Sequence, residues 1–253
     1  MQCKHIQCSI DNTMSSSGVM WGIPKVLHFV WGLWDAGPLP PWARDQVNAW
    51  AAHCPDFAIK IWDKHACETL LRSEKYARWR PFYDRAPRRV MCADLLRYMI
   101  LDHEGGWYLD LDCVPRDKHA LAALCDAQHP FVGLTESNHS AAQARAVGKR
   151  EPVRQGRPEL RRRIANFAVG SVPNHVVWRG LFDRIAQRWG DWVRANPSGV
   201  LARDYDVLYI TGPDAFTESV ASVEAAGIPM HVLSHAQSLR TVGHVSRGSW
   251  KTH

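Results

Sequence analysis

The sequence predicts a single α/β domain, in which a mostly parallel sheet is flanked by helices. Short apolar, β-prone segments alternate with segments of helical periodicity, as is typical of βα units that build a parallel sheet. The chain has 253 residues, which is long enough for a large hydrophobic core. Hydrophobic residues make up 46% of it and charged residues 22%, a globular composition that excludes disordered and fibrous classes.

Strands are predicted where apolar β-prone runs occur, at residues 26–31, 58–62, 107–111, 131–134, 166–169, 230–233 and 241–245. Helices are predicted where apolar residues recur at helical spacing, at 41–53, 64–71, 88–104, 175–190 and 213–226. The strongest of these is 88–104, which Gly105-Gly106 terminates. Residues 1–20 are polar and include a Ser-Ser-Ser-Gly run, so we expect a disordered extension before a folded domain at 21–253.

Several features bear on the compartment of the protein. No stretch reaches the roughly 18 uncharged apolar residues that span a bilayer, so we expect no transmembrane anchor. The first residues include Lys4, His5 and Asp11 and lack a continuous apolar run, so we expect no signal peptide. The seven cysteines form no Cys-x-x-Cys pair, which favours reduced thiols. A cytoplasmic location is therefore expected, with peripheral contact at the inner membrane face left open.

The net charge of +6, from 31 basic and 25 acidic residues, comes from one segment. Residues 141–163 contain Glu151, Glu159 and eight basic residues, which are Arg145, Lys149, Arg150, Arg154, Arg157, Arg161, Arg162 and Arg163. A charge this localised indicates one basic surface element. It is either a solvated helix or loop, or a site for an anionic glycan or lipid, a membrane surface or nucleic acid.

Two charged residues stand out on the otherwise apolar helix 88–104. Asp94 and Arg97 are three positions apart and therefore share a face of this helix. Buried charges are costly unless they are paired with each other or bind a ligand. The pair is consequently either an ion pair that stabilises the helix or part of a binding site.

Further polar residues follow the glycine turn. Tyr108, Asp110 and Asp112 alternate along the chain and are predicted to lie on one face of the strand at 107–111. Two carboxylates on one face repel each other unless a cation lies between them. Hard oxygen ligands of this kind suit Mg²⁺ or Mn²⁺, and these ions in turn bind diphosphates.

The Asp-x-Asp pattern by itself has little specificity. With 17 aspartates in 253 residues, composition predicts roughly one such triplet by chance. The chain has a second one, Asp204-Tyr205-Asp206, which we interpret as a solvated surface pair. The surrounding sequence must therefore decide the role of the first triplet.

That surrounding sequence resembles glycosyltransferase family 32, the group with a sugar-binding region containing a DXD motif. The matching blocks occur in the order IPKVLHFVW (23–31), Trp-Asp (62–63), ADLLRY (93–98), GGWYLDLD (105–112), NFAVGSVPNH (166–175), TGP (211–213) and His244 with Gly248-Ser249-Trp250. The family includes yeast-type α-mannosyltransferases and bacterial capsule and lipooligosaccharide transferases, with large clostridial glucosylating toxins as more distant relatives. The resemblance is strongest over 23–114.

The resemblance implies a GT-A fold, a nucleotide-sugar donor, a divalent metal and retention of the anomeric configuration. Trp31 matches the aromatic residue that stacks on the nucleobase, and Val30 would supply backbone contacts. The alternative to this stacking role is that Trp31 is an aromatic residue of the hydrophobic core. Its place at the end of the first strand favours the functional role, because open α/β sheets bind ligands there.

The polar residues acquire specific roles from the same resemblance. Asp94 and Arg97 match the pair that binds donor-sugar hydroxyls, and Asp110 matches the carboxylate that contacts ribose and sugar. Asp112 matches the direct metal ligand. Tyr108 would lie near the donor or serve packing. Asp110, Asp112 and Arg97 are thus the expected catalytic residues, with Asp110 and Asp112 also binding metal.

The C-terminal segment would complete the site. By resemblance, His244 or Ser249 completes the metal shell and the Trp250 indole N–H reaches the diphosphate. Imidazole beside carboxylates favours Mn²⁺ over Mg²⁺. The alternative for His244 is a solvated side chain that binds no metal. Such a segment commonly closes over the donor and excludes water. Asn166 heads a block that would face the acceptor.

These expectations imply a retaining transfer by front-side displacement, since no carboxylate is evidently placed as a covalent nucleophile. A UDP-sugar is the first expected donor and GDP-mannose the second, with a glycan or glycolipid as acceptor. One alternative is a metal-dependent phosphotransferase or nuclease, which the absence of a Walker loop disfavours. The other is a non-catalytic protein that binds nucleic acid or membrane through the arginine-rich segment.

Overall fold

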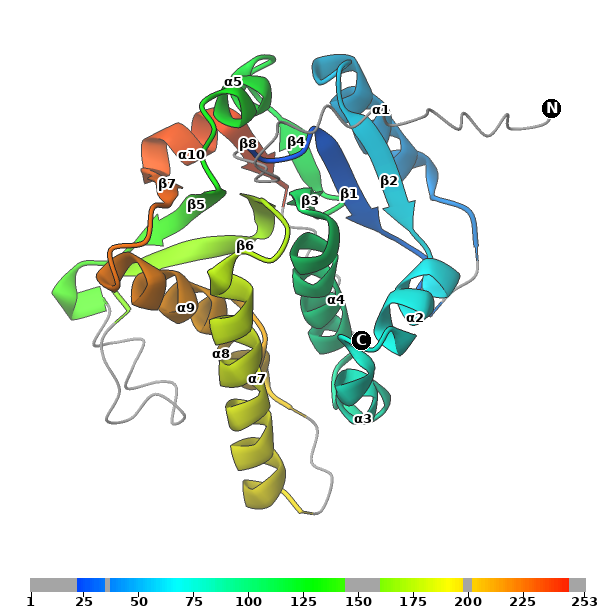
Figure 1. The fold of residues 1–253 in the computed structure, drawn as a ribbon, viewed down its shortest axis with the longest axis vertical. Coiled ribbons are helices and arrows are strands. Elements are labelled where there is room, and N and C mark those ends of the chain that lie inside the picture. Colours follow the sequence, from blue (N-terminus) through cyan, green and yellow to red (C-terminus); the bar gives the residue numbers. More distant parts are fainter. Residues whose placement is uncertain (1–21, 35–36, 144–159, 198–201, 246–253) are drawn as a thin grey trace, which may run out of the picture.

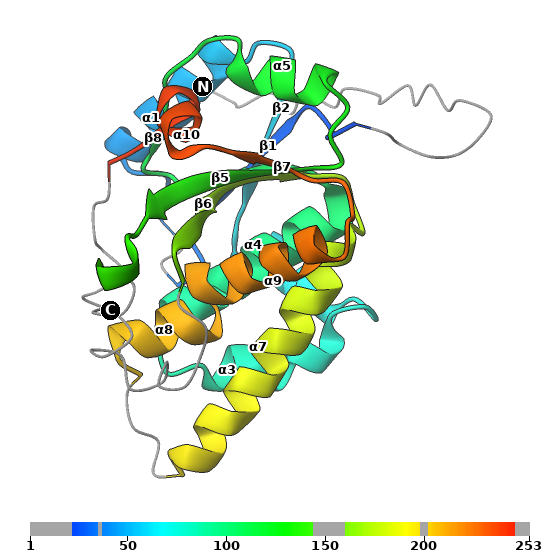
Figure 2. The same cartoon turned by 90° about the vertical axis from the view of Figure 1, so that its left-hand side faces the viewer.

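The computed structural model of the chain describes residues 22–34, 37–143, 160–197 and 202–245. A six-stranded sheet lies between two layers of helices (Figures 1 and 2). The strand order is β2-β1-β3-β6-β5-β7. Strand β6 is antiparallel to both of its neighbours, and the other five strands run in one direction. The predicted α/β architecture with a mostly parallel sheet is therefore confirmed.

The strands of the sheet are β1 (Val26–Val30), β2 (Ala58–Trp62), β3 (Gly106–Leu109), β5 (Phe131–Asn138), β6 (Arg162–Ser171) and β7 (His231–Leu233). A separate antiparallel ladder joins β4 (Cys113–Pro115) to β8 (Val242–His244). This ladder places the last described strand beside the segment that follows β3.

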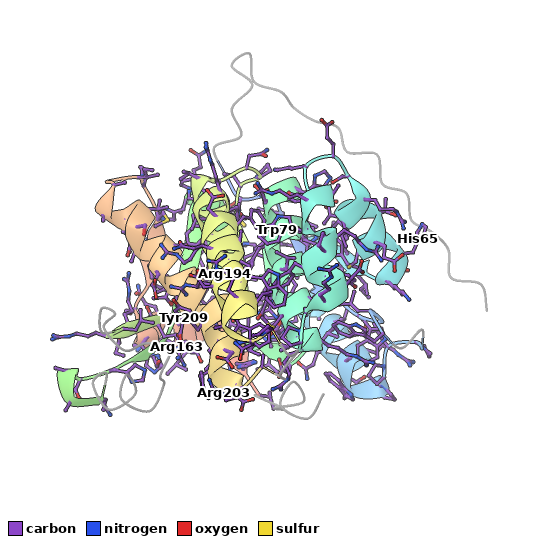
Figure 3. The ribbon with its side chains drawn as sticks, turned by 90° about the horizontal axis from the view of Figure 1, so that it is seen from below. His65, Trp79, Arg163, Arg194, Arg203 and Tyr209 are labelled. Atoms are coloured by element: carbon purple, nitrogen blue, oxygen red, sulfur yellow. The ribbon has the colours of Figure 1, made fainter. Side chains whose placement is uncertain are left out.

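One face of the sheet is covered by α1 (Pro41–His53), α5 (Ala120–Asp126) and α10 (His235–Thr241), seen above the sheet in Figure 2. The other face is covered by α2 (Lys64–Arg72), η1 (Ala77–Trp79), α3 (Arg80–Arg85), α4 (Arg89–Glu104), α7 (Val176–Ala195), α8 (Asp204–Ile210) and α9 (Pro213–Ala225). Figure 3 shows this second layer from below, with α9, α7, α4 and the cyan helices side by side.

Helix α4 lies at the centre of the second layer. Its residues Leu95, Leu96 and Met99 are fully buried, and Tyr98 stacks on Trp178 of α7. A helix that is apolar on all sides is stable only when protein surrounds it. The burial of α4 explains why its two polar residues, which the sequence singled out, are shielded from water.

The expected strands and helices are present, but several shorter elements were not predicted: η1, α3, β4, α5, α8 and α10. Runs of three to seven residues are too short for hydrophobic periodicity to identify them. One predicted boundary is also wrong. Strand β3 ends at Leu109, so Asp110 and Asp112 lie in the turn before β4 and do not share a strand face.

The interpretation of Asp204-Tyr205-Asp206 as a solvated surface pair is wrong for one of its two carboxylates. These residues begin α8, where Asp206 is 2% exposed and accepts a 2.8 Å hydrogen bond from the backbone N–H of Arg203. Asp204 is half exposed and forms an ion pair with Arg88. The triplet therefore belongs to a helix N-terminus, where carboxylates stabilise free N–H groups.

Some expectations concern residues that the structure does not describe. They are the N-terminal extension, most of the basic segment (144–159), Ser249 and Trp250. The described end of the basic segment is ion-paired, since Arg162 contacts Glu224 and Arg163 lies 2.9 Å from Asp214. Within the described ranges, no helix combines the length and the apolar character needed to cross a membrane.

Candidate functional site

The site is built around the glycine turn that joins α4 to β3. Gly105 and Gly106 have φ angles of +69° and +86°. A Cβ on Gly105 would lie 2.7 Å from Pro173, and one on Gly106 would lie 2.8 Å from the carbonyl oxygen of Val26. Only glycine tolerates both this backbone conformation and this close approach. The turn reverses the chain so that the end of β3 returns beside the middle of α4.

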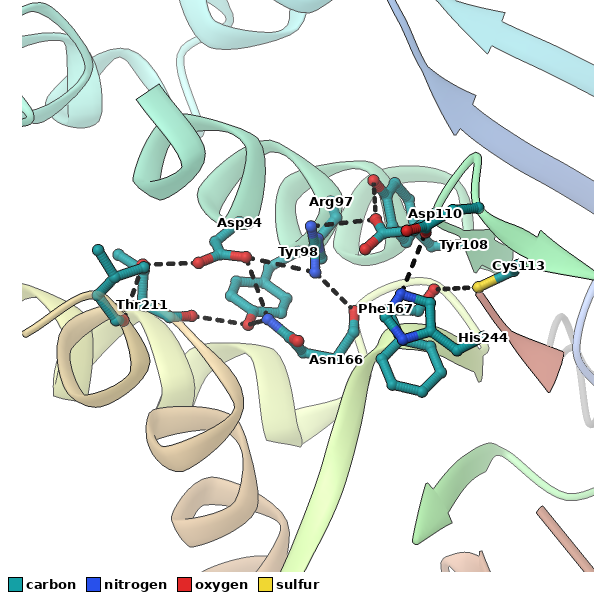
Figure 4. A network of polar contacts seen from close by, with 12 residues as sticks. Asp94, Arg97, Tyr98, Tyr108, Asp110, Cys113, Asn166, Phe167, Thr211 and His244 are labelled. Carbon is teal, nitrogen blue, oxygen red and sulfur yellow. Dashed lines mark hydrogen bonds and ion pairs between the residues drawn. The ribbon is translucent and has the colours of Figure 1, made fainter. Parts of the chain in front are cut away.

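Arg97 is the centre of the resulting polar network (Figure 4). Its guanidinium lies 3.3 Å from Asp94 Oδ1 and 3.1 Å from Asp110 Oδ1, and it donates a 3.0 Å hydrogen bond to the backbone oxygen of Asn166. It also lies over the ring of Tyr108, 5.0 Å from its centroid. Arg97 therefore holds together two carboxylates that the sequence could assign only to separate blocks.

Asp94 has a hydrogen-bond donor at each oxygen. Thr211 Oγ1 donates to Oδ2 at 2.8 Å, and Asn166 Nδ2 donates to Oδ1 at 3.1 Å. Burial raises the pKa of Asp94 to about 6, against the opposing effects of the Arg97 charge and these hydrogen bonds. The amide of Asn166 also donates to Tyr98, so it is directed into this network. Its expected contact with an acceptor stays a prediction.

Asp110 is oriented from three sides. The Tyr108 hydroxyl donates to its Oδ1 at 2.9 Å, Arg97 pairs with the same oxygen, and its backbone N–H donates to the carbonyl of Phe167. Burial raises the pKa of Asp110, and the Arg97 charge counteracts this rise. Asp110 therefore has a defined position just after the end of β3.

Asp110, Asp112 and His244 form a cluster in which each offers one ligand atom and these atoms lie within 4.8 Å of one another. His244 Nε2 lies 3.1 Å from Asp112 Oδ1, and the imidazole stacks on Phe167 at a centroid distance of 4.0 Å. Although burial lowers the pKa of His244, the hydrogen bond to Asp112 and the nearby carboxylates raise it overall. Two carboxylates and one imidazole are ligand types that suit a divalent cation such as Mn²⁺.

A pocket of about 210 Å³ lies beside this cluster, lined by Val30, Trp31, Gly32, Leu33, Trp34, Ala93, Arg97, Tyr108, Asp110 and Leu111. Trp31 is half-buried just after β1 and donates a 3.0 Å hydrogen bond from Nε1 to the carbonyl of Gly37. The Nε of Arg97 is buried and has no hydrogen-bond partner in the described parts of the chain. A buried donor without a partner on a pocket wall is suited to bind a ligand.

The structure thus brings together the predicted donor-binding residues Val30, Trp31, Arg97, Tyr108 and Asp110 along one pocket, with Asp94 directly behind it. The contacts of Thr211 and Phe167 at this site were not predicted from the sequence. Both lie within the matching blocks, at TGP and after Asn166, but their contacts depend on segments distant in the chain.

Comparison with known proteins agrees with this geometry. Residues 40–127 match the family model described as "Glycosyltransferase sugar-binding region containing DXD motif", and Asp110-Leu111-Asp112 lies within that match. This part of the chain is therefore similar to the sugar-binding region of DXD glycosyltransferases.

Two curated relatives of this domain are named inositol phosphoceramide mannosyltransferases 2 and 1, from Schizosaccharomyces pombe. The first is 31% identical over 90 residues, which cover 36% of this chain and 25% of the relative. The second is 29% identical over 106 residues, covering 41% and 32% respectively. The chain therefore spans only a quarter to a third of the length of these relatives.

The solved structure of the PaToxG glycosyltransferase is similar to the chain with a TM-score of 0.50 at 15% sequence identity, over 91% of this chain and 87% of that one. At this identity the likeness shows the fold alone. The fold is the GT-A fold, as the resemblance implied.

Proposed function

We propose that the chain is a metal-dependent glycosyltransferase that moves a sugar from a nucleotide-sugar donor to a glycan or glycolipid. The observation that carries the proposal is the position of the Asp110–Asp112–His244 cluster, directly beside the pocket that contains Trp31 and Arg97. DXD glycosyltransferases of this fold typically use a divalent metal. When bound at the cluster, such an ion supplies positive charge that stabilises the leaving diphosphate.

The donor would lie along the pocket from Trp31 to Asp110. Trp31 offers an aromatic face at the end of β1, where it can stack on a nucleobase, and Val30 lines the same end. Asp112 and His244 would hold the metal together with Asp110, and its charge would attract the diphosphate. The sugar would then lie near Arg97, whose unpartnered Nε can donate a hydrogen bond to it.

Arg97 and Asp94 act by positioning as well as by contact. The guanidinium keeps Asp110 directed at the pocket, and its charge favours the ionised form of both carboxylates. Since these charges are fixed before the donor binds, little reorganisation is needed when negative charge develops on the leaving group.

Retention by front-side displacement is part of the proposal. Among the described residues, Asp110 is the one carboxylate that lines the pocket. Its Oδ1 already forms an ion pair with Arg97 and accepts a hydrogen bond from Tyr108. This arrangement supports a mechanism without a covalent glycosyl-enzyme. The stereochemistry of the product, followed by proton NMR of the anomeric signal, tests this step.

The donor and acceptor are proposed at the level of class. A UDP-sugar and GDP-mannose are the two expected donors. The names of the S. pombe relatives support including a mannosyl donor and an acceptor that carries a lipid-linked polyol phosphate. An acceptor role for the basic segment 141–163 also stays a proposal. It is best tested at the basic residues of 145–157, because Arg162 and Arg163 have internal partners.

A cytoplasmic location also stays a proposal. The five described cysteines, Cys54, Cys67, Cys92, Cys113 and Cys125, are buried free thiols, which supports a reducing compartment. Fractionation of the native cells, with and without a high-salt wash of the membranes, tests it.

The decisive experiment is a thermal-shift measurement with UDP, GDP and CDP, each with and without Mn²⁺. We expect one nucleotide to raise the melting temperature only when Mn²⁺ is present, because an ion held by the cluster would attract the diphosphate. A panel of the corresponding sugar nucleotides is then assayed for hydrolysis and transfer. If no nucleotide binds in a metal-dependent manner, the proposed function is wrong.

A further inference from the structure

A second pocket borders the metal-binding cluster at His244. It has a volume of about 170 Å³ and is lined by Leu134, Thr135, Glu136, Ala165, Phe167, Ser238, Leu239, Val242 and His244. We call it the β5–α10 pocket after two of the elements that form it. The stacked pair His244 and Phe167 belongs to its wall, and His244 also contacts Asp112. The pocket therefore reaches the metal-binding cluster at His244, whereas the pocket that contains Trp31 reaches it at Asp110.

Most polar groups of this pocket are already used within the protein. The Thr135 hydroxyl donates to the backbone oxygen of Leu233 at 2.7 Å, and the Ser238 hydroxyl donates to that of Ser234 at 2.9 Å. His244 Nε2 is directed at Asp112. These groups have satisfied hydrogen bonds and are poorly available to a ligand.

Glu136 is different. It lies on β5 and is half-buried, yet its carboxylate forms no hydrogen bond or ion pair with the other residues that the structure describes. Burial raises its pKa, and the charges of Arg163, His244 and His139 oppose this rise from a distance. Withdrawing a carboxylate from water without a hydrogen-bond donor is unfavourable, so a ligand that supplies a donor would bind favourably here.

The remaining walls define the chemistry of such a ligand. Leu134, Ala165 and Val242 are buried apolar side chains, and Leu239 at the pocket is 59% exposed. Apolar walls suit the C–H faces of a ring, whereas the carboxylate requires hydroxyl donors. The negative charge of Glu136, the one carboxylate among the residues that line the pocket, disfavours a phosphate or carboxylate. A neutral ring that carries several hydroxyl groups satisfies all three conditions.

We propose that the β5–α10 pocket binds the hydroxylated ring of the acceptor, with Glu136 accepting a hydrogen bond from one of its hydroxyl groups. This inference rests on the proposed function, because it takes the Trp31 side of the cluster as the donor side. An anionic part of the acceptor then lies outside this pocket.

The test measures binding of neutral glycosides without a donor. Methyl α-mannoside, methyl α-glucoside and methyl α-galactoside are used as probes in saturation-transfer NMR with the full chain. We expect at least one to bind and the 6-phosphate of the same sugar to bind more weakly. Glu136→Gln should weaken binding by about 10- to 100-fold, as expected for a lost hydrogen bond to a charged group. Glu68→Gln, on the surface of α2, is the matched control.

The variant is expected to fold, because Glu136→Gln keeps the shape of the side chain and removes a half-buried charge. Its melting temperature should equal or exceed that of the wild type. Equal glycoside binding by the wild type and Glu136→Gln, or no binding of any neutral glycoside, would overturn the proposal.

Failure of this inference is distinguishable from failure of the proposed function. Metal-dependent nucleotide binding, measured by thermal shift, does not involve Glu136 and should be unchanged in Glu136→Gln. Nucleotide binding without glycoside binding refutes the acceptor pocket alone. Glycoside binding that depends on Glu136, without nucleotide binding, refutes the transferase function alone. Loss of nucleotide binding in Glu136→Gln contradicts the assignment of the two pockets to separate substrates.

Discussion

His244 Nε2 lies 3.1 Å from Asp112 Oδ1, although 132 positions separate the two residues in the chain. The contact depends on the short ladder of β4 and β8, in which Cys113 pairs with His244. Two strands of three residues each thus bring His244 to the two carboxylates that follow β3. We therefore expect metal binding to depend on the pairing of β8 with β4.

Asp112→Asn is expected to abolish metal-dependent transfer and to leave the fold intact. The substitution removes the charge of a carboxylate that faces His244, and we expect turnover with Mn²⁺ to fall by at least about 100-fold. Asp204→Asn in the second Asp-x-Asp triplet is the matched control, because that half-exposed residue pairs with Arg88 and does not belong to the metal-binding cluster. Near wild-type turnover in Asp112→Asn would show that Asp112 is not a metal ligand.

Phe167→Leu is expected to weaken Mn²⁺ binding without altering the ligands themselves. The Phe167 ring stacks on His244 at an interplanar angle of 12° and orients its imidazole. Loss of a group that orients a metal ligand typically costs 10- to 100-fold in affinity. Calorimetric titration with Mn²⁺ measures the effect, and Phe167→Tyr should bind like the wild type. Equal affinities of the Leu and Tyr variants would contradict a role in orientation.

Thr211→Val is expected to lower the free energy of unfolding by about 1–3 kcal/mol, because it leaves Oδ2 of the buried Asp94 without its hydrogen-bond donor. The substitution preserves the shape of the side chain. Urea denaturation of the metal-free protein measures it. Thr69→Val on the exposed face of α2 serves as control, with an expected change within about 0.5 kcal/mol. Equal losses at the two positions would argue against this network.

His28 should make stability depend on pH. Its side chain is fully buried. Because Nδ1 accepts a hydrogen bond from Trp62 Nε1, the proton of the neutral ring is on Nε2, which donates it to the carbonyl oxygen of Gly105. Burial lowers the pKa of His28 from 6.5 to about 4. Between these values the unfolded chain binds a proton that the folded protein does not bind. The stabilisation is therefore complete above pH 6.5 and is lost as the pH falls toward 4.

The size of this effect is at most about 1.4 kcal/mol per pH unit. Urea denaturation of the metal-free protein at pH 7 and 5.5 measures it, and His28→Asn should show a smaller dependence on pH. Burial also lowers the pKa of His175 to about 4. His175 is present in the wild type and in His28→Asn, so its contribution to the pH dependence cancels when the two proteins are compared. The same pH dependence in both proteins would mean that His28 is not the source.

Much of the site was predictable because its residues lie close together in the chain. Asp94 and Arg97 stood out as charges on an apolar helix, and Asp110 and Asp112 followed a glycine turn that requires glycine at both positions. Their bridging by Arg97 was not predictable, since it depends on how β3 returns along α4.

One interpretation changed with the tertiary structure. Asp206 was expected to be solvated, but it is buried and caps the start of α8. For Asn166 the contact with an acceptor stays a prediction, and the structure adds that its amide donates to Asp94 and Tyr98. A polar side chain has the same sequence signature on a surface as in a buried network, and only the packing of distant segments distinguishes the two cases.

By itself the sequence determined the order of the longer strands and helices, the mostly parallel sheet and the two carboxylates of the metal-binding cluster, because periodicity and turn residues are local properties. The tertiary structure decided which groups meet: His244 with Asp112, Thr211 with Asp94, and the residues that line the two pockets beside the cluster. The two hydrogen bonds join residues that are 132 and 117 positions apart, and they form only when the hydrophobic effect packs both helical layers onto the sheet.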